Sequence, residues 1–526
     1  MTDFSSITRS ETNRDPGDLR RQGVPAAVCA ALGRQIQTGL VVLLLVAFTG
    51  CAASTNPISG RRAFNYAWSP AEELRIGAEA DPQIVAQYGL YDNDSLAEYV
   101  DSLGQELAQV SHFRRPGIDP IFGNMSFHFR VLDSPVVNAF ALPGGFIYVT
   151  RGLLAHLENE AQLAVVLGHE IGHVVGRHGS KAMWRRQFGS GALLLGAIGG
   201  QAVFGGNAAE NIMNVGGTAS QLLFLKYGRG AESESDQLGV DYAALTGYDA
   251  SQASAFFRSL ERLGDQSGQS LPGLLSSHPD PGDRELYIQQ RSARWASELP
   301  MDRVGRGALF RHVGGLVYGT DPRQGFEENG VFYHPQMEFS FPVPAAYTLV
   351  NQPTQVVMAA QDQQAVIVME IDTEHQRARS AADAFKARDD IQVVESGIGQ
   401  AGGMVMHYII ADATSSDGQE LRLRKQYIEK EGSVFVFTGY TLRTSYDDHA
   451  ASFSRTMQGF RTVTDPKILD TKPQRVTLRR NGQSTTFGAL IGSTFPPGLS
   501  QLSLAILNQV EVSDQIPAGE TYKTVK

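Results

Sequence analysis

The sequence predicts an α+β protein: a mainly helical first half containing a small edge sheet, a β-rich C-terminal domain, and a small βααβ tail. Three observations support this expectation. Residues 70–109 and 159–178 have the apolar periodicity of packed helices, and residues 126–131 and 145–150 are short and rich in β-forming residues. After about residue 302, strand-like segments dominate. At 526 residues the chain exceeds one hydrophobic core, because domains average about 150 residues.

The overall composition is that of an ordinary globular protein. Apolar residues make up 42% and charged residues 19%, which indicates neither a disordered chain nor a polytopic membrane protein. The net charge of -10 argues against nucleic acid as the main partner, because phosphate binding needs a basic surface. The only two cysteines, Cys29 and Cys51, lie near the N-terminus, so no disulfide framework is expected in the rest of the chain.

Residues 1–50 are expected to be a signal peptide of the bacterial lipoprotein type. The apolar run at residues 40–48 follows an arginine-containing leader and is too short to span a bilayer comfortably. Small residues then precede Cys51, as in a lipobox, although Phe48 replaces the usual leucine. We expect lipidation of Cys51 to anchor the protein, and Ala52 resembles the outer-membrane sorting signal. The alternative is a plain membrane anchor with an incidental cysteine.

The first folded domain is expected at residues 51–302. Helices at residues 70–109 should precede the two strands, and Asn159 with Gln162 forms an N-cap signal for an apolar helix that ends near Gly176. The Gly- and Ala-rich residues 189–217 suit buried connecting helices; a flap or a membrane-grazing hairpin is the alternative.

Two further regions complete the predicted organisation. Strand-like segments with one intervening helix at residues 374–388 predict a β-rich domain at residues 303–464. Residues 465–526 have a βααβ pattern that weakly resembles a LysM module. The opening Gly-Asp-Thr of that module is missing, so contact with peptidoglycan is only weakly supported.

The apolar helix carries an HExxH motif, His169-Glu170-Ile171-Gly172-His173. Residues four apart share one helix face, so both imidazoles can reach one metal, with Glu170 beside the open coordination position. The alternative is a surface helix with two unrelated histidines. An apolar, capped helix disfavours that alternative, because burying two unpaired histidines is costly. The spacing suits one zinc ion per chain.

A third ligand is expected from a downstream helix. Glu232 can complete a three-ligand catalytic site, and Asp236 can accept the outward N–H of a ligand histidine. Glu234 is expected to point elsewhere, and His178 to cap a helix C-terminus by compensating its dipole. The alternative for this acidic segment is a solvated helix start favoured by the macrodipole.

Several stretches together resemble the gluzincin metallopeptidases of family M48, of the HtpX type and the BepA-like periplasmic branch. The resemblance covers residues 68–302 and rests on residues 138–145, 148–153, 160–178, 227–236 and 277–284. It implies metal ligands at His169, His173 and Glu232 and a general base at Glu170. BepA-like members carry helical repeats after the peptidase, whereas strands follow here, so the partners of those repeats cannot be transferred to this chain.

The same resemblance implies further roles. Asn138 and Ala139 would offer backbone groups to an extended polypeptide substrate. His278, in a His-Pro loop, would take the fourth zinc position and keep the enzyme latent; the alternative is a loop histidine that contacts the site or the substrate. Arg284 would stabilise the oxyanion or merely anchor this loop.

These features favour a zinc-dependent endopeptidase in which Glu170 activates the attacking water. No Ser/His/Asp or Cys/His arrangement competes, and no GxSxG elbow is present. The expected role is hydrolysis of misfolded or stalled envelope proteins, in the bacterial periplasm and lipid-anchored to the outer membrane. The alternative is a chaperone or assembly factor for outer-membrane proteins, with secondary proteolysis.

Overall fold

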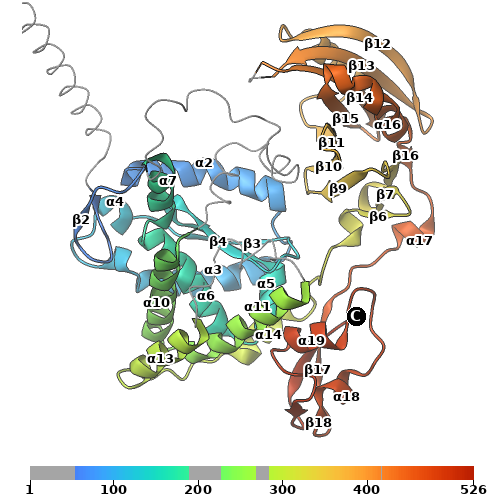
Figure 1. The fold of residues 1–526 in the computed structure, drawn as a ribbon. Coiled ribbons are helices and arrows are strands. Elements are labelled where there is room, and N and C mark those ends of the chain that lie inside the picture. Colours follow the sequence, from blue (N-terminus) through green and yellow to red (C-terminus); the bar gives the residue numbers. More distant parts are fainter. Residues whose placement is uncertain (1–53, 189–226, 268–283, 416–417) are drawn as a thin grey trace, which may run out of the picture. The chain divides into compact units, whose positions relative to one another are not determined.

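The computed structural model describes residues 54–188, 227–267, 284–415 and 418–526 (Figure 1). Its compact unit is Ser54–Lys526. Cys51 and the signal region, the Gly- and Ala-rich residues 189–217, and His278 lie outside the described residues. Within the described ranges, no helix combines the length and the apolar character needed to cross a membrane.

The first part of the unit is mainly helical. Side-chain caps begin several of its helices: Ser69 and Glu72 form a capping box, and the side chains of Asn93 and Asn159 accept backbone N–H bonds. The helices are α2 (Pro70–Tyr88), α3 (Asp94–Gln109), α4 (Pro120–Gly123), α5 (Arg151–His156), α6 (Glu160–Val175), α7 (His178–Phe188), α10 (Arg229–Leu245), α11 (Ala253–Ser267), α13 (Arg284–Ala296) and α14 (Arg306–Val313).

A three-stranded sheet lies among these helices and confirms the predicted edge sheet. Strand β5 (Phe146–Thr150) is central, pairs in parallel with β3 (His128–Leu132) and antiparallel with β4 (Ala139–Leu142). The strand order β3-β5-β4 leaves β4 at an edge.

Helices α6 and α10 pack closely at the centre of this part (Figure 1). A Cβ added at Gly168 would lie 3.0 Å from the Gly239 backbone, and one at Gly172 would lie 3.1 Å from the Ser235 Cα. Glycine at these positions therefore allows the two helices to approach, which is what brings their polar side chains together.

The β-rich region has a seven-stranded antiparallel sheet in the order β12-β13-β14-β15-β11-β10-β9. Alternate residues of β15 face opposite layers: Phe435 and Phe437 join the cluster that contains Phe453 of α16, whereas Val434 and Val436 pack with α15. The elements of this sheet and its helices are β9 (Tyr347–Asn351), β10 (Gln355–Ala360), β11 (Ala365–Asp372), α15 (Ala378–Lys386), β12 (Ile391–Ala401), β13 (Met404–Thr414), β14 (Glu420–Lys430), β15 (Ser433–Leu442) and α16 (Tyr446–Gln458).

A smaller sheet, in the order β16-β8-β7-β6, completes the β-rich region. Its strands are β6 (Phe326–Glu328), β7 (Val331–His334), β8 (Phe339–Pro342) and β16 (Arg461–Thr462). Phe332, Phe339 and Phe341 from these strands belong to the same apolar cluster as Phe435 and Phe437. The predicted β-rich character of this part of the chain is confirmed.

The tail contains the expected order of strand, helix, helix and strand, with an additional pair of two-residue strands flanking the helices. Strand β17 (Val476–Arg480) pairs with β20 (Thr521–Val525), β18 (Thr485–Thr486) pairs with β19 (Gln515–Ile516), and α18 (Phe487–Ile491) and α19 (Gln501–Leu507) lie between them in sequence. Its buried apolar residues belong to the same cluster as the buried apolar residues of α3, α6 and α10.

The chain leaves and re-enters the helical part at one place. The Tyr318 N–H donates to the Gln474 carbonyl at 2.8 Å, and the Val476 N–H donates to the Leu316 carbonyl at 2.8 Å. We call residues 54–318 together with 474–526 the helical body, and residues 319–473 the β-rich region. Residues before and after the expected boundary at 302, together with tail residues beyond 464, thus contribute to one core, and the four-part domain division itself stays a prediction.

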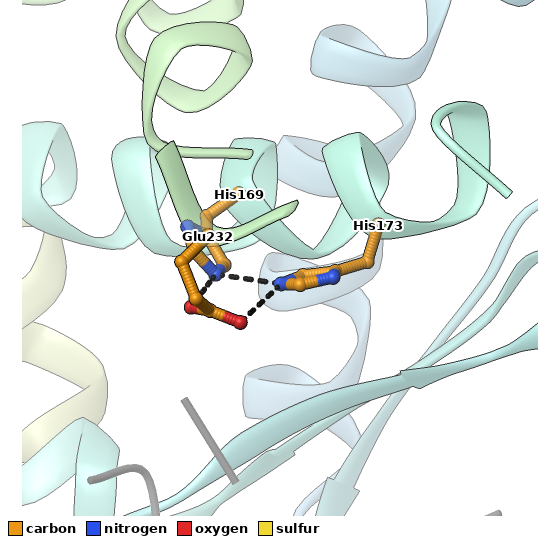
Figure 2. Close-up of side chains that lie close together, drawn as sticks. All are labelled: His169, His173 and Glu232. Carbon is orange, nitrogen blue, oxygen red and sulfur yellow. Dashed lines mark hydrogen bonds and ion pairs between the residues drawn. The ribbon is translucent and has the colours of Figure 1, made fainter. Parts of the chain in front are cut away.

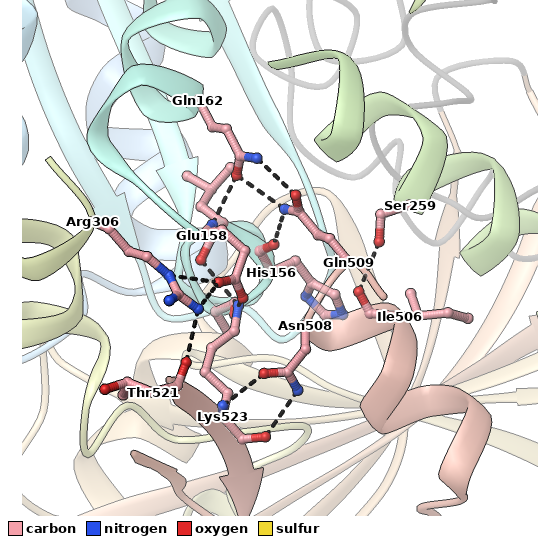
Figure 3. Close-up of polar contacts among 12 residues, drawn as sticks. His156, Glu158, Gln162, Ser259, Arg306, Ile506, Asn508, Gln509, Thr521 and Lys523 are labelled. Carbon is pink, nitrogen blue, oxygen red and sulfur yellow. Dashed lines mark hydrogen bonds and ion pairs between the residues drawn. The ribbon is translucent and has the colours of Figure 1, made fainter. Parts of the chain in front are cut away.

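Polar contacts also join the tail to the start of α6 (Figure 3). The fully buried Lys523 Nζ donates to the carbonyls of Ala155 at 2.9 Å and Leu157 at 3.0 Å, and pairs with Glu158 at 3.0 Å. Gln509 bonds the side chain of Gln162, in the first turn of α6. The tail therefore supports the turn from which α6 begins.

Candidate metal centre

Helices α6 and α10 bring three ligand side chains together (Figure 2). His169 and His173 are one helical turn apart, and their Nε2 atoms lie 2.9 Å from each other. Glu232, in the first turn of α10, is fully buried, and its two carboxylate oxygens lie 3.6 Å from the respective Nε2 atoms. The structure therefore assembles the three ligands that the sequence predicts.

The chemistry of this donor set fits a catalytic zinc ion. One atom from each residue can be chosen so that all three lie within 4.8 Å of one another, and all three residues are buried. Two imidazoles and one carboxylate are a known ligand set of catalytic zinc, which keeps the fourth position for water or substrate. Among the residues that the structure describes, no other group of histidine, cysteine and acidic side chains converges in this way.

The outer nitrogen of His169 faces a buried ion pair. His169 Nδ1 lies 2.8 Å from Asp236 Oδ1, and Arg284 Nε donates to the same oxygen at 2.9 Å. Burial raises the pKa of Asp236, but the Arg284 charge and the His169 hydrogen bond lower it to about 2. The carboxylate thus stays ionised and can hold His169 with its Nδ1 protonated and its Nε2 available.

Arg284 begins α13, and its guanidinium is committed to Asp236. Its carbon atom Cζ also lies 4.3 Å from the centre of the Phe257 ring. Nη2 is 3.8 Å from Glu232 Oε2, on the ligand carboxylate. These contacts favour a positioning role behind the ligands; stabilisation of an oxyanion by Arg284 stays a prediction.

His178 differs from its expected role. Helix α6 ends at Val175, Arg177 adopts a left-handed conformation with φ of 53°, and His178 is the first residue of α7. Its buried ring turns inward, and Nδ1 lies 3.0 Å from Nδ1 of His173. The expectation of a cap at a helix C-terminus was wrong, because the turn at Arg177 starts a new helix and redirects the side chain.

Glu234 is not one of the three converging ligands, as expected, but it has a partner beside the centre. Its carboxylate lies 2.9 Å from Nε2 of His178 and 3.7 Å from Nζ of Lys181. The His178 hydrogen bond lowers the pKa of Glu234 despite the opposing effect of burial. The sequence signal that could have found this pair is a histidine five residues after the motif, together with an acid two residues after the third ligand.

Glu170 and Tyr227 lie at the same centre. Glu170 is fully buried on α6, and the Tyr227 ring stacks on His173 with 4.2 Å between ring centroids. Burial raises the pKa of the Tyr227 phenol, and the carboxylates of Glu170 and Glu232 raise it further. Tyr227 therefore presents a protonated phenol near both carboxylates, a feature that the sequence analysis did not single out.

Asn138, directly before the edge strand β4, does not offer its backbone groups to a substrate as predicted. The Asn138 carbonyl accepts from the Thr150 N–H at 3.0 Å, and the Asn138 N–H donates to Thr150 Oγ1 at 3.1 Å. Asn138 is thus used within the sheet. In an antiparallel pair the bonding direction alternates, so the backbone groups of Ala139 and Ala141 face the open edge. Ala141 also lines a small cavity with His173 and Tyr227.

Comparisons with known proteins agree with this geometry. Residues 94–291 match the family described as Peptidase family M48. The beta-barrel assembly-enhancing protease of Escherichia coli (strain K12) is 29% identical over 271 residues, which are 49% of this chain and 53% of that protein. The putative beta-barrel assembly-enhancing protease of Vibrio cholerae is 32% identical over 211 residues, 38% of this chain and 40% of that protein.

A mitochondrial metalloendopeptidase is also similar to this chain. The mitochondrial metalloendopeptidase OMA1 of Arabidopsis thaliana is 33% identical over 166 residues, which cover 32% of each chain. The chain spans about half the length, or less, of these curated relatives. The family match at residues 94–291 includes the three ligand residues.

Proposed function

We propose, on the premise that residues 94–291 form a domain of peptidase family M48, that this protein is a zinc-dependent endopeptidase. The observation that carries the proposal is the convergence of His169, His173 and Glu232 within a buried centre. A zinc ion held by these residues supplies Lewis acidity, which makes water nucleophilic near neutral pH and polarises a peptide carbonyl.

The residues of the chain then act in defined ways. Glu170, on the same helix as both histidines, accepts a proton from the attacking water and returns it to the leaving amine. Asp236, with Arg284, holds His169 in the tautomer that exposes Nε2. The outward backbone groups of Ala139 and Ala141 pair with an extended substrate as an added strand.

The names of the relatives support a proposal for the substrate class and location. Because similar proteins are named beta-barrel assembly-enhancing proteases, we propose that this enzyme cleaves misfolded or stalled polypeptides of the bacterial envelope. Lipidation at Cys51, attachment to the outer membrane and latency through His278 belong to the same proposal, and these two residues lie outside the described ranges.

A second candidate function is a chaperone or assembly factor for outer-membrane proteins. It is favoured by strand β12, an 11-residue strand at the edge of the seven-stranded sheet. Large apolar side chains there and on β13 are exposed: Val394 at 51%, Ile398 at 70% and Val405 at 55%. An exposed edge with such side chains can pair with an extended polypeptide.

The replacement Glu170→Gln tests the enzymatic proposal and separates the two candidates. We expect the variant to bind as much zinc as the wild type and to lose casein cleavage by at least about 100-fold, since proton transfer is removed. Glu298→Gln, an exposed residue beyond the end of α13, is the matched control. Cleavage by Glu170→Gln at the wild-type rate would refute the proposed mechanism. Retention of the cellular role without cleavage would favour the assembly factor.

A further inference from the structure

The two ligand histidines are supported differently. His169 Nδ1 faces a carboxylate directly, at 2.8 Å from Asp236. His173 Nδ1 instead faces another imidazole, that of His178, at 3.0 Å. The far nitrogen of His178 then meets the Glu234 carboxylate at 2.9 Å. His178 is buried, so solvent does not replace these partners.

For a neutral His178, these contacts are consistent with one arrangement of hydrogens. Ionised Glu234 can only accept, so His178 Nε2 must carry a hydrogen and donate it. In neutral His178, Nδ1 is then an acceptor. His173 Nδ1 must therefore carry the hydrogen between the two rings, and its Nε2 keeps a lone pair.

A further contact agrees with this assignment. The buried Ser235 Oγ lies 3.2 Å from His178 Nδ1, and a hydroxyl can donate to an accepting ring nitrogen. The opposite tautomer would direct two N–H groups at one another, or place a lone pair against the Glu234 carboxylate. Both nitrogens of His178 are thus engaged away from the three ligand atoms.

We propose that His178 and Glu234 form a relay that fixes the tautomer and orientation of His173, so that its Nε2 is presented to the metal. The relay rests on the proposed zinc site and adds two positioning residues to it. Outer hydrogen-bond partners of this kind set the basicity and ring orientation of ligand histidines. His173 thus depends on a carboxylate as His169 does, but through one intervening imidazole.

Zinc affinity of the full chain, measured by competition with a chromophoric chelator, tests the relay. We expect His178→Leu to weaken zinc binding by about 10–100-fold, and Glu234→Ala to weaken it by less within that range. His178→Asn should recover part of the affinity, because its amide oxygen can accept from His173. Lys181→Met, which removes the charge 3.7 Å from Glu234 but keeps both relay residues, is the matched control and should bind zinc like the wild type.

A second readout separates positioning from folding. In the metal-free protein labelled with ¹⁵N-histidine, the ring shifts of His173 should report the Nδ1–H tautomer in the wild type and a mixture of tautomers in Glu234→Ala. Thermal unfolding of each metal-free variant shows whether it folds. If His178→Leu does not fold, Glu234→Ala still tests the relay, because Glu234 lies at its partly exposed end.

The outcomes distinguish the relay from the proposed function. Unchanged zinc affinity and unchanged ring shifts in folded Glu234→Ala would overturn the relay while leaving the zinc site intact. Absence of zinc binding by the wild type would instead overturn the proposed function. Weakened zinc binding together with a mixed tautomer supports the relay.

Discussion

The helical body and the β-rich region are stabilised in different ways. In the helical body, buried ion pairs join segments that are distant in sequence: Arg177 with Glu73, and Lys523 with Glu158. In the β-rich region, the cluster around Phe437 is dominated by aromatic and aliphatic side chains. Some ion pairs there, such as Arg388 with Asp390, are exposed, and that of Arg422 with Asp412 is partly buried but joins two neighbouring strands.

This difference suggests where each region is vulnerable. A desolvated charge is strongly destabilising when its partner is lost, whereas an exposed ion pair contributes little. The buried pairs of the helical body lie next to the helices that hold the ligands, since Arg177 follows α6 and Glu158 precedes it. The geometry of the metal centre should therefore depend on the helical body and its tail, and little on the β-rich region.

The largest effect should come from removing the tail. A chain that ends at Thr464 loses the tail residues of the shared core, among them Phe487, Leu504 and Tyr522. We expect this chain to lack the cooperative thermal unfolding of the helical body, measured by calorimetry. Excision of residues 319–473, with a short Gly-Ser linker between Tyr318 and Gln474, should preserve that transition, because these two residues are hydrogen-bonded. Equal damage from both deletions would contradict the comparison.

A smaller effect, confined to one region, is expected from Phe437→Ala. Phe437 is fully buried in the β-rich region, so the replacement should cost about 3–5 kcal/mol of its unfolding free energy. Denaturant unfolding followed by a probe in each region should show the loss in the β-rich region, while casein cleavage stays at the wild-type level. A matching loss of cleavage would indicate that the two regions are coupled.

Lys523→Met should destabilise the helical body by about 3 kcal/mol, because it leaves the buried Glu158 without one of its cationic partners. Arg306 still pairs with Glu158, which limits the loss. Arg388→Met is the matched control in the β-rich region and should change stability by less than about 0.5 kcal/mol. Thermal and urea unfolding measure both; similar values for the two variants would remove the distinction drawn between buried and exposed pairs.

The smallest effect is a difference in acid sensitivity. Burial lowers the pKa of His112 and of His156 in the helical body, each to about 4, and the pKa of His334 in the β-rich region also to about 4. An unfolded histidine binds a proton near pH 6.5, whereas these folded ones do not, so stability falls as pH decreases from about 6.5 to about 4.

Burial also lowers the pKa of His312 in the helical body, so the described part of the helical body holds more such histidines and should lose stability more steeply than the β-rich region in this window. Calorimetry between pH 7 and pH 4 measures how the stability of each region changes with pH. His156→Gln should make this pH dependence shallower for the helical body. An unchanged slope in that variant would show that His156 does not contribute.

Much of the metal centre was predictable because it depends on local geometry. The spacing of His169 and His173 on a capped apolar helix places both rings on one face, whatever surrounds that helix. Glu232 and Asp236 repeat the same spacing at the start of another helix, so Glu232 can bind the metal while Asp236 bonds a ligand histidine. The predicted edge sheet and the β-rich character of the later segments follow equally from periodicity within short segments.

The sequence by itself therefore determined the helix of the HExxH motif, the strands β3 and β5 of the edge sheet and the residues that can hold a metal, since all of these follow from side-chain spacing along one segment. Only the tertiary structure decided which buried groups meet. The left-handed turn at Arg177 directs His178 to Glu234 on another helix, and Lys523 reaches Glu158 from the far end of the chain. Such pairings depend on the packing of distant segments and on the cost of leaving a buried polar group without a partner, which no local pattern specifies.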